Sequence, residues 1–187
     1  MFEMSAPQES LRTDRELVDA VLQRQDERAF RELYRRHTPR LFMLVARLLA
    51  RGDHEAEDVV QEVWIHAFES LDRFQWNSAF ATWLTGIGLN RVRDRIRRYG
   101  RSRETGVDVV PDIAIVADPP DERIDLEKMI SRLPDDLRLV LVLHDVEGMK
   151  HREIADHLAI PEGTSKTLLS NARSRIRAMM SRKGEQT

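Results

Sequence analysis

Residues 74–103 read FQWNSAFATWLTGIGLNRVRDRIRRYGRSR, and this segment decides the fold. Four large aromatic residues within ten positions lead into seven arginines, which are opposed by a single acid, Asp94. Aromatic rings stack on unpaired bases and arginines hold phosphates, so the combination indicates a nucleic acid with exposed bases. A second interpretation, core aromatics with solvated arginines, stays open because arginine-rich segments are not specific to one function.

Helical spacing divides the aromatic residues of this segment into two groups. Phe80, Trp83 and Leu84 share one side of a helix, which predicts a core-facing stripe in a helix over residues 78–99. Phe74 and Trp76 precede that helix among polar residues, so its packing does not account for them. We therefore take these two rings as candidates for contact with a ligand.

The composition of the whole chain is that of a folded protein with segregated charge. Of its 187 residues, 41% are hydrophobic and 33% are charged, so a packed core is expected. The net charge is only −2, but residues 104–127 hold eight acids and one base, whereas residues 164–187 hold six bases and one acid. Such local charge, more than the total, decides what a surface attracts.

Two absences from the sequence bear on the cellular compartment. The chain has no cysteine, which excludes disulfides and thiolate metal sites. No apolar run approaches the ~20 residues that span a bilayer, and the first ten residues lack a signal-peptide pattern. We expect a soluble, cytoplasmic protein without membrane insertion.

Apolar spacing and capping residues predict five helices in the N-terminal part of the chain. The expected helix starts are the capping box Thr13-Asp-Arg-Glu16, Asp26, the pair Thr38-Pro39, Asp53 and Ser78. In the helix after Asp53, the residues expected to be buried are Ala56, Val59, Val60, Val63, Trp64, Ala67 and Phe68. Its outer face, which is either an acidic binding patch or an ordinary solvated face, carries Glu57, Asp58, Gln61 and Glu62.

Helical periodicity disappears between two parts of the chain. Residues 101–121 combine acids with one glycine and three prolines, which indicates a flexible acidic linker. The predicted fold is therefore all-α, with two small helical domains. Its predicted divisions are a flexible tail at 1–12, a helical bundle at 13–100, the linker at 101–121 and a second domain at 122–183.

The second helical part ends in a candidate helix-turn-helix. Residues 137–143 are apolar almost all round, which predicts the core helix of this part. A short helix over 152–158 precedes a last helix, whose expected inner stripe is Leu168, Leu169, Ala172, Ile176, Met179 and Met180. The expected outer face is Ser165, Lys166, Thr167, Ser170, Asn171, Arg173 and Arg177. A helix fits the major groove, where such side chains address base edges, although a purely structural helical hairpin is the alternative.

Together these pieces resemble the extracytoplasmic-function (ECF) family of bacterial sigma factors over residues 14–180. The matching fragments are EDVVQEVW (57–64), residues 74–80 with TWL (82–84), LP (133–134), DVEG (145–148), EIA (153–155) and IPEGT (160–164). The resemblance implies a region 2 bundle and a region 4 helix-turn-helix. It implies a protein, not an enzyme, that directs core RNA polymerase to promoters and promotes DNA melting in a stress or envelope response. It also implies no cofactor, an anti-sigma factor as a partner, and a monomer when the protein is free.

The resemblance assigns roles to individual residues. Polymerase binding falls to Glu57, Asp58, Gln61 and Glu62. Capture of an extruded base and contact with the strand at the minus 10 element of promoter DNA fall to Phe74, Trp76, Asn77, Ser78, Asn90, Arg93 and Arg97. Contacts with the minus 35 element fall to Lys166, Thr167, Ser170, Asn171 and Arg173.

Two positions depart from the family pattern in ways that affect structure. Trp76 stands where glycine is common, which predicts a bulkier melting loop with an altered base preference. Ala159 replaces a turn glycine, at a place where a left-handed residue would be strained by ~1 kcal/mol. We therefore expect the turn before the last helix to be built differently.

Two rival classes make different predictions. A stand-alone helix-turn-helix regulator would bind duplex DNA without polymerase. A helical metalloenzyme would use the pair Glu62 and His66, or the histidines at 144, 151 and 157. The chain lacks the paired Glu-x-x-His repeat of di-iron bundles, and metal analysis of the purified protein would separate these classes.

Overall fold

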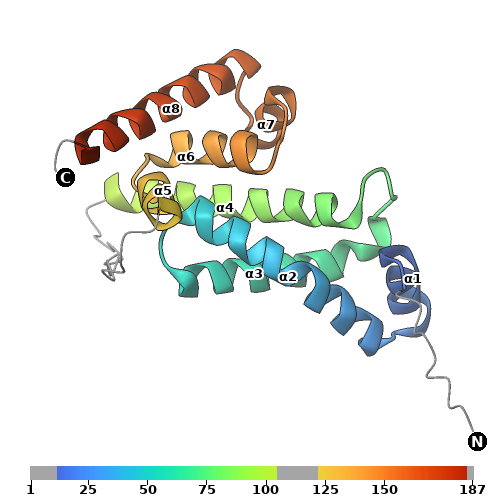
Figure 1. Ribbon diagram of the computed structural model, residues 1–187. Helices are drawn as coiled ribbons and strands as arrows, with labels where there is room; N and C mark the ends of the chain where they lie inside the picture. Colours follow the sequence, from blue (N-terminus) through green and yellow to red (C-terminus); the bar gives the residue numbers. More distant parts are fainter. Residues whose placement is uncertain (1–11, 105–121, 185–187) are drawn as a thin grey trace, which may run out of the picture.

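A computed structural model describes residues 12–104 and 122–184 (Figure 1). All regular secondary structure in these residues is helical, which confirms the all-α prediction. The N-terminal half contains α1 (Asp14–Arg24), α2 (Glu27–Leu49), α3 (Asp53–Ser70), a 3-10 turn (Leu71–Arg73) and α4 (Phe80–Glu104). The C-terminal half contains α5 (Glu122–Ser131), α6 (Asp135–Leu141), a π-helical turn (Val142–Val146), α7 (His151–Leu158) and α8 (Glu162–Gly184).

The ends of these helices bear on the predicted divisions of the chain. Helix α4 continues to Glu104, past the boundary predicted at residue 100, and α5 begins at Glu122. The rest of the predicted linker, at 105–121, and the tail at 1–11 lie outside the described residues. No helix among the described residues is long and apolar enough to cross a membrane.

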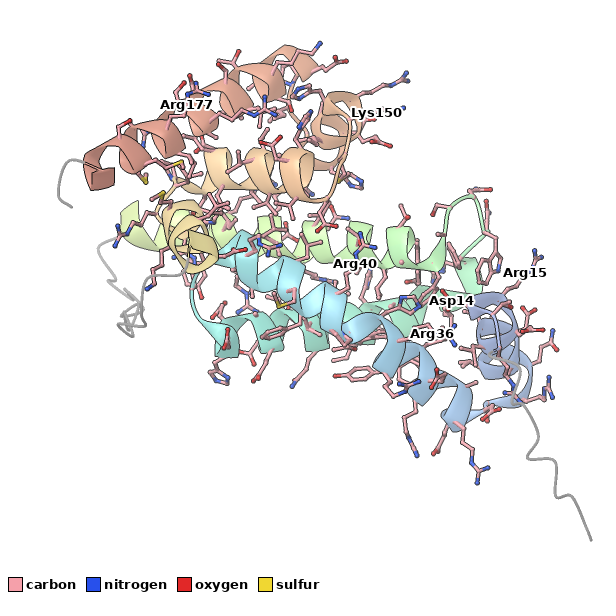
Figure 2. The ribbon with its side chains drawn as sticks, viewed as in Figure 1. Asp14, Arg15, Arg36, Arg40, Lys150 and Arg177 are labelled. Atoms are coloured by element: carbon pink, nitrogen blue, oxygen red, sulfur yellow. The ribbon has the colours of Figure 1, made fainter. Side chains whose placement is uncertain are left out.

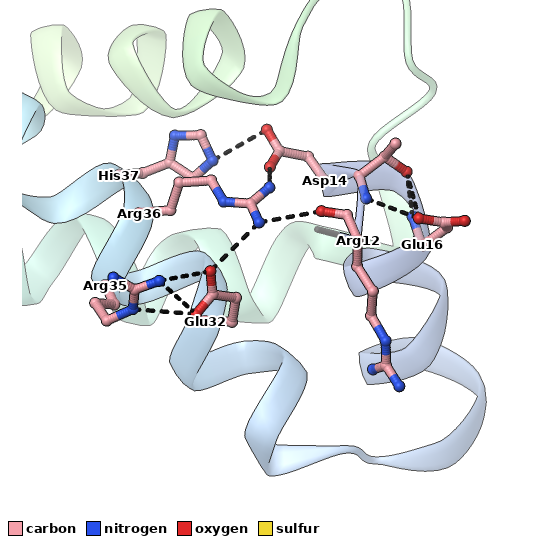
Figure 3. Close-up of polar contacts among 8 residues, drawn as sticks. Arg12, Asp14, Glu16, Glu32, Arg35, Arg36 and His37 are labelled. Carbon is pink, nitrogen blue, oxygen red and sulfur yellow. Dashed lines mark hydrogen bonds and ion pairs between the residues drawn. The ribbon is translucent and has the colours of Figure 1, made fainter. Parts of the chain in front are cut away.

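Helix α1 begins as its sequence predicts and is tied to α2. The Thr13 amide donates to Glu16 Oε2 (2.7 Å) and the Glu16 amide donates to Thr13 Oγ1 (3.3 Å), which confirms the capping box. Asp14 then accepts from Arg36 Nη1 (2.7 Å) and lies 3.0 Å from His37 Nε2. Figure 3 shows these contacts joining the two helices.

Helix α2 corrects one prediction. A new helix was expected at Thr38-Pro39, but α2 runs unbroken from Glu27 to Leu49 with Pro39 inside it. A proline inside a helix removes one N–H donor and strains the preceding turn. Here the apolar face is continuous across that point, so packing on both sides outweighs the local cost. Its buried residues are Ala29, Leu33, Leu41, Leu44, Val45, Leu48 and Leu49.

A glycine in α4 allows this helix to pack closely against α2. At Gly88 of α4, an added Cβ would lie 3.1 Å from Leu41 Cδ1 of α2, so the glycine permits the close approach.

The predicted inner face of α3 is buried apart from Phe68, which is 59% exposed. Asp53, predicted to cap α3, is instead its first residue, and Gly52 at φ 92° occupies the cap position.

The C-terminal half is built on α6 and lies against the N-terminal half (Figure 1). The predicted core of α6 and the turn after it is buried, together with Arg138, whose side chain is 3% exposed. Arg138 Nε donates to the Leu48 carbonyl (2.9 Å) and its Nη2 donates to the Leu49 carbonyl (3.0 Å), at the end of α2. A cation thus satisfies carbonyls that a helix end leaves without partners.

Three ion pairs border this buried contact. They are Arg40 with Glu147 (3.1 Å), Arg47 with Glu127 (2.7 Å) and Arg51 with Asp135 (3.1 Å). All three arginines come from α2 or from the residues just after it. In Figure 2, Arg40 lies on the side of α2 that faces the C-terminal half.

Candidate nucleic-acid interfaces

The aromatic residues of the predicted melting loop pack against one another. Phe74 stacks on Trp83 of α4, with ring centroids 4.8 Å apart and planes inclined by 25°. Trp76 lies 4.6 Å from Phe74, and both rings are half-buried against the core. The expectation that helix packing does not account for these two rings was therefore wrong, because Trp83 extends the core out to the loop. Asn77 and Ser78, at the tip of the loop, are exposed.

Trp76 has an unusual backbone conformation for its residue type. Its φ is 57°, in the left-handed region that favours glycine. A non-glycine residue there costs roughly 1–2 kcal/mol. Contacts of the indole offset this cost, since aromatic pairs contribute about 0.5–1.5 kcal/mol beyond their buried area. One further contact is the guanidinium of Arg15, which lies 5.7 Å from the ring centroid.

The arginine run on α4 is divided between different neighbours. Asn90 and Arg97 are exposed, as expected for residues that grip a strand. Arg93 is half-buried, and its Nη1 donates to the His157 carbonyl of α7 (2.7 Å). Arg95 turns toward α3, which the sequence alone did not indicate.

Arg95 joins α4 to the acidic helix α3. Its side chain is 15% exposed and lies 2.5 Å from carboxylate oxygens of both Glu55 and Glu62. Burial opposes the charge of Arg95, but these two carboxylates outweigh burial and raise its pKa. Glu62 therefore has a structural partner within the chain.

The predicted polymerase patch on α3 contains apolar as well as polar side chains. Glu57 and Gln61 are exposed and Asp58 is half-buried. On the same side of α3, Ile65 is 61% exposed and Phe68 is 59% exposed. Ile65 follows Gln61 by four residues and Phe68 follows Ile65 by three, so both lie on the stripe of Asp58 and Gln61.

A shallow groove adjoins this stripe. It has a volume of about 620 Å³ and is lined in part by Phe30, Tyr34 and Phe68. The sequence analysis assigned Phe68 to the buried face because its spacing also fits the inner stripe, but the side chain is 59% exposed.

The helix-turn-helix keeps a left-handed residue in its turn. Ala159 has φ 55° and ψ 47°, and its amide donates to the Ala155 carbonyl. The expectation of a differently built turn was wrong: the chain keeps this geometry with alanine and accepts the strain. The turn then leads through Pro161 into α8.

Helix α8 presents most of the predicted minus 35 residues to solvent. Lys166, Thr167, Ser170 and Asn171 are all exposed. Arg173 is also exposed, but its Nε and Nη2 donate to the carboxylate of Asp145 (3.0 and 2.6 Å). Their roles in DNA recognition stay predictions.

The inner stripe of α8 differs from the prediction at two positions. Ser165, expected on the outer face, is fully buried, and Met180, expected inside, is 56% exposed. Ser165 lies four, seven and eleven residues before Leu169, Ala172 and Ile176, which are the other buried residues of this helix up to Ser181. Its position therefore follows helical periodicity, and its polarity misled the assignment.

The titratable residues of the described segments form no cluster that could hold a metal ion. This includes the histidines at 144, 151 and 157.

Each half of the chain matches a known protein family. The family described as Sigma-70 region 2 matches residues 33–102, and the family described as Sigma-70, region 4 matches residues 123–176. The ECF RNA polymerase sigma-E factor of Escherichia coli K12 is 32% identical over 179 residues, covering 88% of this chain and 92% of that protein. The ECF RNA polymerase sigma factor SigE of Mycolicibacterium smegmatis is 32% identical over 164 residues. That match covers 83% of this chain but only 63% of the relative, so the chain spans less than two thirds of that protein.

Solved structures agree with this assignment. CnrH, in its complex with the cytosolic domain of CnrY, is 28% identical with a TM-score of 0.57, over 90% of this chain and 97% of its own. The sigma factor RpoE of Bartonella quintana, in its complex with the anti-sigma factor NepR, has a TM-score of 0.66 over 81% of this chain and 96% of its own. At 24% identity, that second likeness supports the fold alone. The chain belongs to the ECF sigma factors, the non-catalytic subunits that direct RNA polymerase to promoters.

Proposed function

We propose that the two halves divide the promoter between them, with α8 at the minus 35 element and the loop before α4 at the minus 10 element. The observation that carries this proposal is the outer face of α8, the second helix of the helix-turn-helix. Four polar side chains are exposed there: Lys166, Thr167, Ser170 and Asn171. A helix of this kind fits the major groove, where Asn can pair bidentately with adenine.

At the minus 10 element, the loop and α4 hold a base that has left the duplex. Extrusion costs a few kcal/mol, and stacking on an aromatic ring returns about 1–3 kcal/mol per base. Phe74 and Trp76 provide the rings, with the exposed Asn77 and Ser78 beside them. Asn90, Arg93 and Arg97 contact the strand and its phosphates.

The exposed stripe of α3 docks on core RNA polymerase. Asp58 and Gln61 provide its polar contacts, with Glu57 at the edge, and Ile65 and Phe68 provide apolar area. Glu62 contributes less directly, because Arg95 already holds its carboxylate.

An anti-sigma factor is a further partner of this chain, acting on it in the cytoplasm. Support comes from CnrH, which was solved in complex with the cytosolic domain of CnrY and is 28% identical to this chain. The regulon of the present protein belongs to a stress or envelope response, as the family name, extracytoplasmic function, suggests. The free protein is a monomer with a region 2 domain at 13–100 and a region 4 domain at 122–183, joined by the acidic linker.

Run-off transcription with core RNA polymerase and a library of genomic fragments tests the proposal. Transcripts that require this protein reveal both promoter elements. Replacing Lys166 and Asn171 by alanine removes the dependence of transcription on the minus 35 element. The matched control is Arg132→Ala, at an exposed position between α5 and α6, which keeps this dependence. A minus 35 footprint that persists in the double variant contradicts the role of α8.

A second pair of variants tests the polymerase surface. Asp58→Asn with Gln61→Ala weakens co-purification with core polymerase, while Asp19→Asn on the exposed face of α1 leaves it unchanged. Unaltered binding by the α3 variant contradicts the assignment of this surface.

A further inference from the structure

The buried hydroxyl of Ser165 has one polar partner in the neighbouring helix. Ser165 Oγ lies 2.9 Å from Nδ1 of His151, the first residue of α7, so the contact spans the turn of the helix-turn-helix. Among the described residues, Ser165 and Arg138 are the only polar or charged residues that are buried. A buried hydroxyl is costly unless it is hydrogen-bonded.

The contact continues as a chain of interactions that returns to α8. The His151 ring stacks on His144, with centroids 4.6 Å apart and planes inclined by 29°. His144 Nδ1 lies 2.8 Å from Asp145 Oδ1, and the Asp145 carboxylate accepts both donors of Arg173. The network therefore begins and ends on the same helix.

Resting on the proposed role of α8 at the minus 35 element, we infer that His151 and Ser165 are positioning residues that set the rotation of this helix. A helix seated only by apolar side chains tolerates small shifts, because such contacts are not directional. Turning α8 by one residue rotates it by about 100° and removes Ser165 from His151. Buried polar pairs are best known for this use, the fixing of register.

A second anchor fixes the tilt of the helix. Arg173 follows Ser165 by eight residues, which is about 12 Å along a helix axis. Two anchors at that separation define the direction of α8 as well as its rotation. Lys166, Thr167, Ser170 and Asn171 all lie between them, so their presentation to base edges depends on both anchors.

The charges around His151 favour its neutral form. Burial lowers its pKa, and His144, Lys166 and Arg173 lower it further, while Glu162 opposes them. These groups come from the turn before α7 and from α8, the two elements packed against the ring. Protonation of His151 would place a cation over the neighbouring His144 ring and against the base of α8.

The full chain is tested with Ser165→Ala, His151→Phe and the double variant. His151→Phe keeps a ring for the stack on His144 but removes Nδ1. The ligand is a duplex selected by the wild-type protein from a random pool, and a scrambled duplex reports non-specific binding. We expect each single variant to lose about tenfold in the ratio of specific to scrambled affinity, and the double variant to lose no more than a single one.

Controls separate positioning from folding. Ser174→Ala, an exposed serine of the same helix, keeps the wild-type ratio. His151→Asn, which retains a polar nitrogen near the position of Nδ1, restores part of the loss. The wild-type ratio falls as the pH drops through the pKa of His151, which burial holds below the ordinary histidine value, and the ratio of His151→Phe does not follow it.

Three outcomes would overturn the inference. These are an unchanged ratio in both single variants, losses that multiply in the double variant, or a drop in scrambled binding equal to the drop in specific binding. A wild-type protein that selects no duplex, while its variants unfold at the same temperature, would overturn the role of α8 itself.

Discussion

Replacing Arg138 by methionine should destabilise both halves of the protein, although the residue belongs to the C-terminal half. The side chain is 3% exposed, and its guanidinium donates to the carbonyls of Leu48, Leu49 and Leu133 and to Asp135. Burial lowers the pKa of Arg138, and Asp135 opposes that effect. Methionine keeps the apolar stem and removes every one of these hydrogen bonds.

The expected magnitude follows from what the substitution leaves behind. Removing one member of a buried charged network costs about 3–5 kcal/mol. Asp135 retains Arg51 at 3.1 Å, so the low end applies and the loss is about 3 kcal/mol. For a chain of this size, 1 kcal/mol moves the unfolding temperature by about 2–4 °C, which gives a fall of about 6–12 °C.

The tryptophans provide a reporter for one half only. All three, Trp64, Trp76 and Trp83, lie in the N-terminal half, whereas far-UV circular dichroism reports helices of both halves. Because Arg138 caps the end of α2, the transition seen by tryptophan fluorescence should fall together with the circular dichroism transition. Arg132→Met, an exposed arginine nearby, should shift neither.

A split between the two signals would refute this reasoning. If circular dichroism showed the loss while tryptophan fluorescence kept the wild-type midpoint, the bonds to Leu48 and Leu49 would contribute nothing to the N-terminal half.

Four further predictions concern single residues. Ala159→Gly should stabilise the C-terminal half by about 0.5–1 kcal/mol in denaturant unfolding, since it relieves a left-handed alanine. Trp76→Gly relieves the same strain but loses the contact with Phe74, so it should destabilise the fold by about 1–2 kcal/mol; stabilisation would contradict that balance. Arg173, followed by His144, lowers the pKa of Asp145. This contribution to stability is present above the unfolded pKa of about 3.9 and is lost as the pH falls through the lower folded value; a pH series of unfolding midpoints should show the loss, and Asp145→Asn should abolish it. Arg95→Met should lower the free energy of unfolding by about 2–3 kcal/mol, because Glu55 and Glu62 would lose their shared cation, and an equal effect of the exposed Arg97→Met would argue against this cause.

Local signals predicted local structure well. The Thr13–Glu16 box depends on residues three apart, and it formed as expected. The apolar run of α6 likewise consists of neighbouring residues, and it correctly identified the core of the C-terminal half. The fold class followed from patterns of this kind, whereas the family followed from the resemblance of short fragments such as EDVVQEVW (57–64).

The errors arose where distant segments decide the outcome. Pro39 lies inside α2 because packing on both sides holds the helix, and no local signal reports that packing. Arg95 meets Glu62 across 33 residues of sequence, and Phe74 meets Trp83 across a loop. Ser165 was assigned to the outer face of α8 because it is polar, although helical periodicity places it on the inner face. These errors therefore concern long-range contacts or a polar residue in a buried position.

The junction between the two halves has two layers that respond differently to the solution. The three bordering ion pairs of Arg40, Arg47 and Arg51 each include a partly exposed partner. Such pairs are weak and are screened by salt, over a Debye length of about 8 Å at physiological ionic strength. The bonds of Arg138 lie behind them, away from the solvent. Raising the ionic strength should therefore loosen the rim of the junction and leave its centre closed, so that salt alone weakens the contact by degrees without separating the halves.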